Sequence, residues 1–201
     1  MTGFTYHTIE REAYSDFRDR GSKFFGYAYP VETVEECKAI LQKLKKEHPK
    51  ATHYCLAWRL GAAAELTRVS DDGEPSGSAG KPIEGQILSR GLTNVLVVVV
   101  RYFGGSLLGV PGLIHAYKTA ASDALDNAGI QEKKVEYLFT IRFDYTVMNE
   151  VMMAMRESGC RTRSQDQGLF CSYDLAVPME NKEKVLSRMK EIRGVEISGI
   201  H

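Results

Sequence analysis

The sequence feature that most constrains the fold is the run Val95–Val100, which contains five valines and one leucine and is the most apolar stretch of the chain. Branched side chains favour extended backbone, and no position in the run is suited to face water. The pattern predicts a strand over Leu92–Val100 that is covered on both faces or lies at the centre of a sheet. The fold must therefore supply covering layers around this strand.

Two glycine-rich loops flank the run. The first reads Asp-Asp-Gly-Glu-Pro-Ser-Gly-Ser-Ala-Gly-Lys-Pro at residues 71–82, and the second starts with Arg-Tyr-Phe-Gly-Gly at residues 101–105. Each loop leads into a predicted helix, a short one that ends at Gly91 and a longer one that ends at Gly129. A helix N-terminus presents unpaired N–H groups and the positive end of the dipole, so two of them beside one strand favour an anion site.

The remaining pattern predicts an α+β chain of two domains. Thr33 and Glu36 form a capping box that starts a helix, whereas residues 16–21 are polar and typical of a turn. In the first half, further strands are expected at residues 4–9, 22–31, 51–60 and 66–69. In the second half, strands at 137–145, 160–164, 169–177 and 195–200 and helices at 147–158 and 178–193 give the ferredoxin-like order βαββαβ. The expected domains are residues 1–130 and 137–201, joined by a linker at 131–136.

Three carboxylates lie within four residues of the first loop: Asp71, Asp72 and Glu74. They could bind a divalent cation, or they could pair with Lys81 or Arg101. One short loop supplies too few ligands for a cation, so turn chemistry is favoured over a metal site. No metal or other cofactor is predicted. Arg101 follows the buried strand, where it could bind a phosphate or carboxylate while Tyr102 stacks on a base. The alternative is an internal salt bridge from Arg101 to Asp71 or Asp72.

Other residues of the loops allow two interpretations. Glycines let a ligand approach the backbone, hydroxyl groups and a lysine add polar contacts, and a histidine in the preceding strand adds a group that titrates near neutrality. The same glycines could instead serve tight turns and close helix packing. The predicted ligand-binding residues are Asp71, Asp72, Glu74, Ser76, Ser78, Lys81, Arg101, Tyr102, Gly104, Gly105 and His53.

Charge and length limit the classes of function. Lys+Arg and Asp+Glu both number 26, so net charge gives no general attraction to nucleic acid or anionic membrane. The N-terminus lacks a signal-peptide pattern, and no apolar run approaches the roughly 20 residues that a membrane helix needs. The four cysteines show no metal-ligand or disulfide spacing. A reducing, cytoplasmic location without membrane association is the expectation.

The two loops together resemble the signature of the IMPACT family, in its bacterial YigZ-type form. The resemblance extends from residues 71–82 through Asn-Val-Leu-Val-Val-Val-Val-Arg-Tyr-Phe-Gly-Gly at 94–105 to Ala116 and Tyr117. It implies a first domain similar to a ribosomal-protein fold with a left-handed βαβ crossover, and a second domain like the last domain of elongation factor G. The chain departs from the family pattern at Pro111, where glycine is frequent, and at His115, where a basic residue is frequent.

The resemblance implies a role in the regulation of translation and no established reaction. The leading hypothesis is a non-enzymatic binding protein that contacts RNA, the ribosome or a translation-associated protein through the two loops. A second hypothesis is an enzyme that acts on a phosphorylated small molecule held at the loops, with His53 or Asp72 as acid–base group. A third is a protein–protein module without a small ligand, as the eukaryotic relatives imply.

Overall fold

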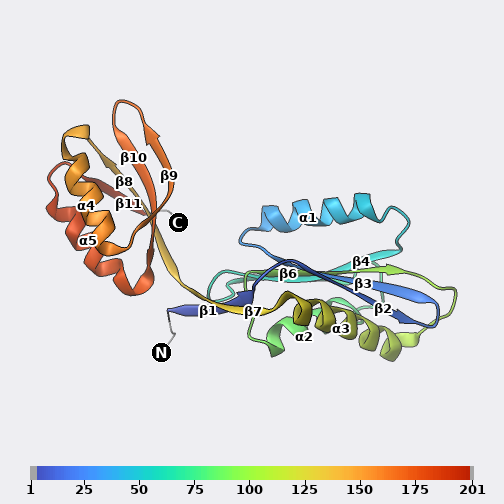
Figure 1. Cartoon of the computed structure of the whole chain (residues 1–201). Helices are drawn as coiled ribbons and strands as arrows, with labels where there is room; N and C mark the ends of the chain where they lie inside the picture. Colours follow the sequence, from blue (N-terminus) through green and yellow to red (C-terminus); the bar gives the residue numbers. More distant parts are fainter. Residues whose placement is uncertain (1–3, 200–201) are drawn as a thin grey trace. The chain divides into compact units, whose positions relative to one another are not determined.

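The computed structural model describes residues 4–199, which form two compact units (Figure 1). One unit is Tyr6–Lys133, and the other contains the chain from Lys134 onward together with Phe4 and Thr5. The stretch 131–136, expected as a linker because of its charge, mostly belongs to strand β7 (Ile130–Lys134), which pairs with β1 (Thr5–Ile9) in a two-stranded sheet. A two-stranded sheet leaves much of its surface in water, so strand and linker compositions are alike there.

The first unit is built on a five-stranded antiparallel sheet in the order β2-β3-β6-β4-β5. These strands are Ala13–Asp19 (β2), Ser22–Pro30 (β3), His53–Leu60 (β4), Leu66–Ser70 (β5) and Val95–Tyr102 (β6). The valine run lies in the central strand β6, and every residue of Val95–Val100 is fully buried, which confirms the predicted buried strand.

Strand β2 was not expected, because Asp16 and Arg18 made residues 16–21 look like a turn. The prediction was wrong: the strand runs to Asp19, and the turn is confined to Arg20 and Gly21, both with positive φ. The polar residues fit because β2 is an edge strand. Asp16 and Arg18 pair with each other on its exposed side, at 2.8 Å between Oδ2 and Nη2.

Helices cover both faces of the sheet (Figure 1). The side chains of β6 alternate between these faces and so contribute to two separate cores. Helix α1 (Val34–Glu47) packs over Leu96, Val98 and Val100, and its predicted capping box is present. Helices α2 (Gly80–Ser89) and α3 (Gly109–Ala128) pack on the other face, over the remaining valines. The long α3 approaches β3 closely, since a Cβ on Gly26 would lie 2.4 Å from the carbonyl oxygen of Ala120.

One of the two crossovers in the five-stranded sheet of the first unit is left-handed. Helix α1 connects the parallel strands β3 and β4 across β6, and α2 connects the parallel strands β5 and β6 across β4. These two connections start from strands of opposite direction, cross the sheet in opposite senses and use opposite faces. They therefore have opposite handedness, and one of the two is left-handed, as the family resemblance implied. Such a crossover is rare in proteins.

The second unit contains the predicted ferredoxin-like fold, with the sheet order β11-β8-β10-β9. Its strands are Glu136–Phe143 (β8), Arg161–Gln167 (β9), Cys171–Pro178 (β10) and Glu196–Gly199 (β11). Its helices are α4 (Met148–Ser158) and α5 (Lys182–Glu191), each preceded by a 3₁₀ turn, Tyr145–Val147 and Met179–Asn181. Its own core includes Phe139, Ile141 and Val185. No helix among residues 4–199 is both long and apolar enough to cross a membrane.

Candidate functional site

The first glycine-rich loop folds around the carboxylate of Asp71. Its Oδ1 accepts hydrogen bonds from the N–H groups of Gly80 (2.8 Å) and Ala79 (3.1 Å), and its Oδ2 accepts one from Gly77 (2.9 Å). Burial acts to raise the pKa of Asp71, but these three N–H groups and the charge of Lys81 outweigh it and lower the pKa below its ordinary value. The start of α2, expected as part of an anion site, therefore already holds an anion from the chain itself.

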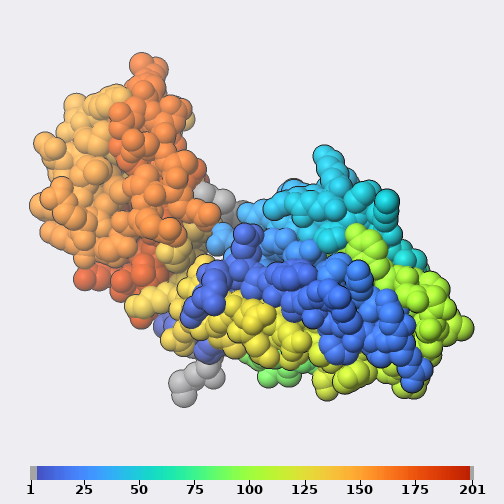
Figure 2. All heavy atoms as spheres, turned by 45° about the vertical axis from the view of Figure 1, so that its right-hand side comes forward, coloured from blue at the N-terminus to red at the C-terminus, as the bar shows by residue number. Residues whose placement is uncertain are grey.

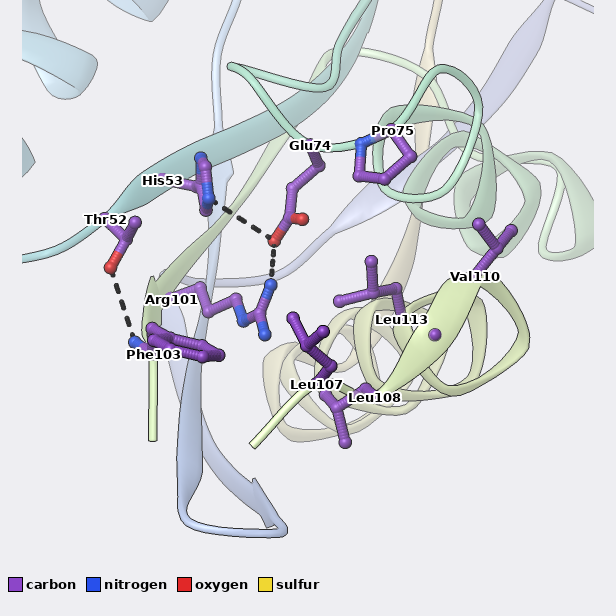
Figure 3. Close-up of a pocket in the computed structure, with 11 residues that line it drawn as sticks. Thr52, His53, Glu74, Pro75, Arg101, Phe103, Leu107, Leu108, Val110 and Leu113 are labelled. Carbon is purple, nitrogen blue, oxygen red and sulfur yellow. Dashed lines mark hydrogen bonds and ion pairs between the residues drawn. The ribbon is translucent and has the colours of Figure 1, made fainter. Parts of the chain in front are cut away.

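Asp72 fixes the beginning of β4 and the orientation of His53. Its Oδ2 accepts the N–H of Tyr54 at 2.7 Å, and its carbonyl oxygen lies 2.8 Å from Nδ1 of His53. Since a carbonyl oxygen only accepts, Nδ1 carries the proton in this contact. The other ring nitrogen, Nε2, then points toward Oε1 of Glu74 at 3.8 Å (Figure 3).

Glu74 and Arg101 form a buried ion pair between the two loops. Nη1 of Arg101 lies 2.5 Å from Oε1 of Glu74, and the side chains are only 6% and 4% exposed. The hydroxyl of Tyr117 donates to the same oxygen at 2.8 Å, and burial raises the pKa of this hydroxyl well above its ordinary value. An internal salt bridge to one of the three carboxylates was among the alternatives expected for Arg101, and the partner is Glu74, whereas Asp71 and Asp72 bond other groups.

A pocket of about 350 Å³ opens above this ion pair (Figure 3). His53, Glu74 and Arg101 form its polar part, so the structure brings these three of the predicted residues together. Thr52 and Pro75 also line the pocket. The rest of the lining comes from the second loop and the first turns of α3, with Phe103, Leu107, Leu108, Gly109, Val110 and Leu113. Leu107 is 84% exposed, and Phe103 and Val110 are about half exposed. The pocket therefore has a charged base and an apolar rim.

The predicted residues of the first loop that remain do not line this pocket. Ser76 is exposed, and the buried Ser78 hydroxyl donates to the carbonyl oxygen of Pro75 at 2.6 Å. Lys81 is exposed on the first turn of α2. The Ser78 hydroxyl is thus engaged in a hydrogen bond within a turn of its own loop, whereas Ser76 and Lys81 face solvent.

The predicted residues of the second loop divide between the two faces of the sheet. The Tyr102 hydroxyl bonds Nδ1 of His48 at 3.0 Å, on the α1 face. Gly104 donates its N–H to Ser22 Oγ at 3.1 Å, and a Cβ on Gly104 would lie 1.9 Å from the backbone of Gly21. Gly105 has a φ of +87°. In Figure 2 this segment, in yellow-green, lies against the blue β2–β3 hairpin.

The apolar rim was not among the predicted site residues. Leu107 and Val110 are ordinary apolar residues in a sequence, and their exposure is a property of the fold. The one signal that the sequence offered is position: an apolar pair, Leu107 and Leu108, stands inside an otherwise glycine- and serine-rich loop.

Comparisons with known proteins agree on one family. Residues 20–125 match the model of the Impact N-terminal domain. The chain is 36% identical over 154 residues to the IMPACT family member YvyE of Bacillus subtilis, which covers 77% of this chain and 71% of that protein. It is 33% identical over 159 residues to the IMPACT family member YigZ of Escherichia coli, covering 78% of each chain. A solved structure described as a hypothetical protein is 27% identical with a TM-score of 0.77, covering 98% of both chains.

Proposed function

The chain belongs to the IMPACT family, and from this premise we propose that it is a non-enzymatic binding protein in the regulation of translation. It holds a segment of a translation-associated protein at the pocket between the two glycine-rich loops. The link to translation rests on family membership. The choice of a protein as the partner rests on the pocket.

The observation that carries this proposal is the division of the pocket into a base whose opposite charges pair with each other and an exposed apolar rim. Glu74 already receives Arg101 and Tyr117, so the strongest polar groups of the base are paired with each other. Leu107 and Val110 remain in water at the mouth. Apolar side chains grouped around a pocket are typical of protein interfaces, where an anchor residue fills the pocket and the rim excludes water.

The charges of the pocket favour a protein over RNA. A phosphate needs uncompensated cations, because the backbone contacts of nucleic acids are electrostatic. The guanidinium of Arg101 is buried and neutralised by Glu74, and the carboxylate of Glu74 would repel a phosphate group at the base. Phe103 offers an exposed ring, but its neighbours Leu107 and Val110 carry no charge.

The test compares two leucines of nearly equal exposure. Leu107→Asp places a charge on the rim, and Leu169→Asp places one on the β9–β10 turn of the other unit, where Leu169 is 87% exposed. Each full-length variant is immobilised, and the translation-associated proteins it retains from a nuclease-treated cell extract are quantified. We expect the retained amount of one stoichiometric partner to fall at least tenfold in Leu107→Asp, which corresponds to a loss of about 1.4 kcal/mol of binding free energy. Leu169→Asp should retain the partner as the wild type does.

Two results would contradict the proposal. Equal retention by both variants excludes the rim as the contact. A partner that nuclease treatment removes from the wild-type protein shows that RNA carries the association.

A second candidate function is the enzyme acting on a phosphorylated small molecule. The observation that favours it is His53, whose Nε2 points at the buried Glu74 in a pocket large enough for a small ligand. A melting series with phosphates, nucleotides and phosphorylated sugars distinguishes the two functions. A ligand at 100 times its Kd stabilises by about 2.7 kcal/mol. Unchanged melting across the series, with partner retention intact, rejects the enzyme.

A further inference from the structure

The outer edge of the five-stranded sheet at β5 is unpaired among the described residues. Strand β5 (Leu66–Ser70) is bonded to β4 on one side and has no strand neighbour on the other. Its first four residues are exposed, including Leu66 at 56%. An unpaired edge presents backbone N–H and C=O groups that another extended segment can bond.

A groove of about 380 Å³ runs beside this edge, between α1 and strands β4 and β5. We call it the basic groove. Its apolar walls are Val34, Cys37 and Leu41 of α1 and Leu56 and Trp58 of β4. It arises because one helix, about 10 Å wide, cannot cover five strands spaced about 4.8 Å apart. The basic groove shares no lining residue with the pocket at Glu74.

Cations dominate the rim of the basic groove. Lys38, Lys45 and Arg68 line it, and Asp72 is the one acidic residue among its lining residues. The carboxylate of Asp72 is engaged by the N–H of Tyr54. Lys38 has only an exposed contact of 3.8 Å to Glu35, which contributes little in water. Lys45 lies over the Tyr54 ring at 5.4 Å. The rim therefore attracts negative charge.

From the unpaired edge and the cationic rim we infer that β5 and the basic groove bind an extended, acidic segment of a protein partner. The segment adds as a sixth strand to β5, and its backbone bonds the edge groups of Leu66–Ser70. Alternate side chains of an added strand point to one face, so those on the α1 face reach the basic groove. Apolar side chains there contact Leu41 and Trp58, and flanking carboxylates pair with Lys38 and Arg68.

The test uses the full chain and a fluorescein-labelled eight-residue peptide, Asp-Thr-Val-Thr-Val-Thr-Asp-Thr, in which the Asp and Val side chains share one face of an extended strand. This Asp–Val peptide is compared by fluorescence anisotropy with a Lys–Val peptide that has Lys at both Asp positions. We expect the Asp–Val peptide to bind at least tenfold more tightly. The double substitution Lys38→Glu and Arg68→Glu should weaken binding of the Asp–Val peptide at least tenfold. The control pair Lys43→Glu and Lys46→Glu makes the same change in net charge at exposed positions of α1 that do not line the groove.

Equal binding of the two peptides overturns the inference, because the cationic rim then contributes nothing to recognition. Equal loss in the two variant pairs also overturns it, because general charge attraction explains that result. Strand addition is tested with two Asp–Val peptides, N-methylated at odd or at even residues. Only one edge of an added strand bonds β5, so we expect one of the two to lose binding. Binding by both with unchanged affinity overturns the strand-addition geometry.

Discussion

Replacing Asp71 tests whether its carboxylate determines the conformation of the first loop. Asp71→Ala removes the acceptor for three backbone N–H groups, those of Gly77, Ala79 and Gly80. A hydrogen bond to a charged group contributes about 1.5–3 kcal/mol, and measured losses of a helix N-cap are about 0.5–2 kcal/mol. Asp71 is half-buried, so water replaces part of the interaction. We therefore expect a loss of about 3 kcal/mol from the free energy of unfolding of the first unit.

The chain provides a specific probe for this measurement. Its one tryptophan, Trp58, lies in β4 and is 8% exposed, so its fluorescence reports the unfolding of the first unit. Urea unfolding followed at Trp58 avoids mixing the transitions of two units, which would violate a two-state treatment. Asp123→Ala, at an exposed position of α3, is the matched control and should change the free energy of unfolding by less than about 0.5 kcal/mol.

The lowered pKa of Asp71 also predicts a pH dependence. Because the folded pKa lies below the unfolded value of about 3.9, the ionised carboxylate stabilises the fold fully above that value. This contribution is lost as pH falls through the folded pKa. The difference in stability between wild type and Asp71→Asn should stay constant from pH 7 to about pH 5 and shrink below about pH 4. A difference that does not change with pH, or an Asp71→Ala variant as stable as wild type, refutes the assigned role.

Two further predictions concern buried contacts of the same unit and use the same fluorescence assay. Arg101→Met should destabilise by about 3–5 kcal/mol because it leaves the Glu74 carboxylate buried without its cation, and adding Glu74→Gln should restore most of the loss; a double variant no better than the single one contradicts this. Gly26→Ala should destabilise by about 1–3 kcal/mol because its Cβ would meet Ala120, whereas Gly85→Ala in α2 has open space and should stabilise by about 0.5–1 kcal/mol; equal effects at both positions exclude the packing explanation.

The sequence predicted the parts of the fold that depend on local residue patterns. The valine run of β6, the capping box at Thr33 and the βαββαβ periodicity of the second unit depend on neighbours in sequence, and the structure confirms each. Strand β2 was missed because an edge strand tolerates charge, so Asp16 and Arg18 gave a turn-like composition. For the same reason, the charged strand β7 was taken for part of the linker expected at residues 131–136.

The site was less predictable, because the direction of each carboxylate depends on how its loop turns. Asp71, Asp72 and Glu74 are nearly adjacent in sequence, yet they bond three different partners. Asp71 bonds its own loop, Asp72 bonds β4, and only Glu74 reaches across to Arg101. No spacing rule distinguishes these outcomes, because a positive φ at Asp72 and Gly73 redirects the chain between them.

Several polar groups of the two loops are engaged in hydrogen bonds and ion pairs within the fold. Three N–H groups at the start of α2 are bonded by Asp71, and Nη1 of Arg101 is paired with Glu74, whereas Nε of Arg101 is buried without a hydrogen-bond partner. Asp71 therefore holds its own loop in place, and the pair of Glu74 and Arg101 holds the two loops together. Leu107 and Val110, which carry no charged or hydrogen-bonding side chain, are the residues that the proposed function assigns to contact with a partner. A surface of this kind gains affinity from apolar contact, and the buried charges beneath it fix its shape. The proposed function therefore assigns the two loops to framing a protein interface rather than to cradling an anion.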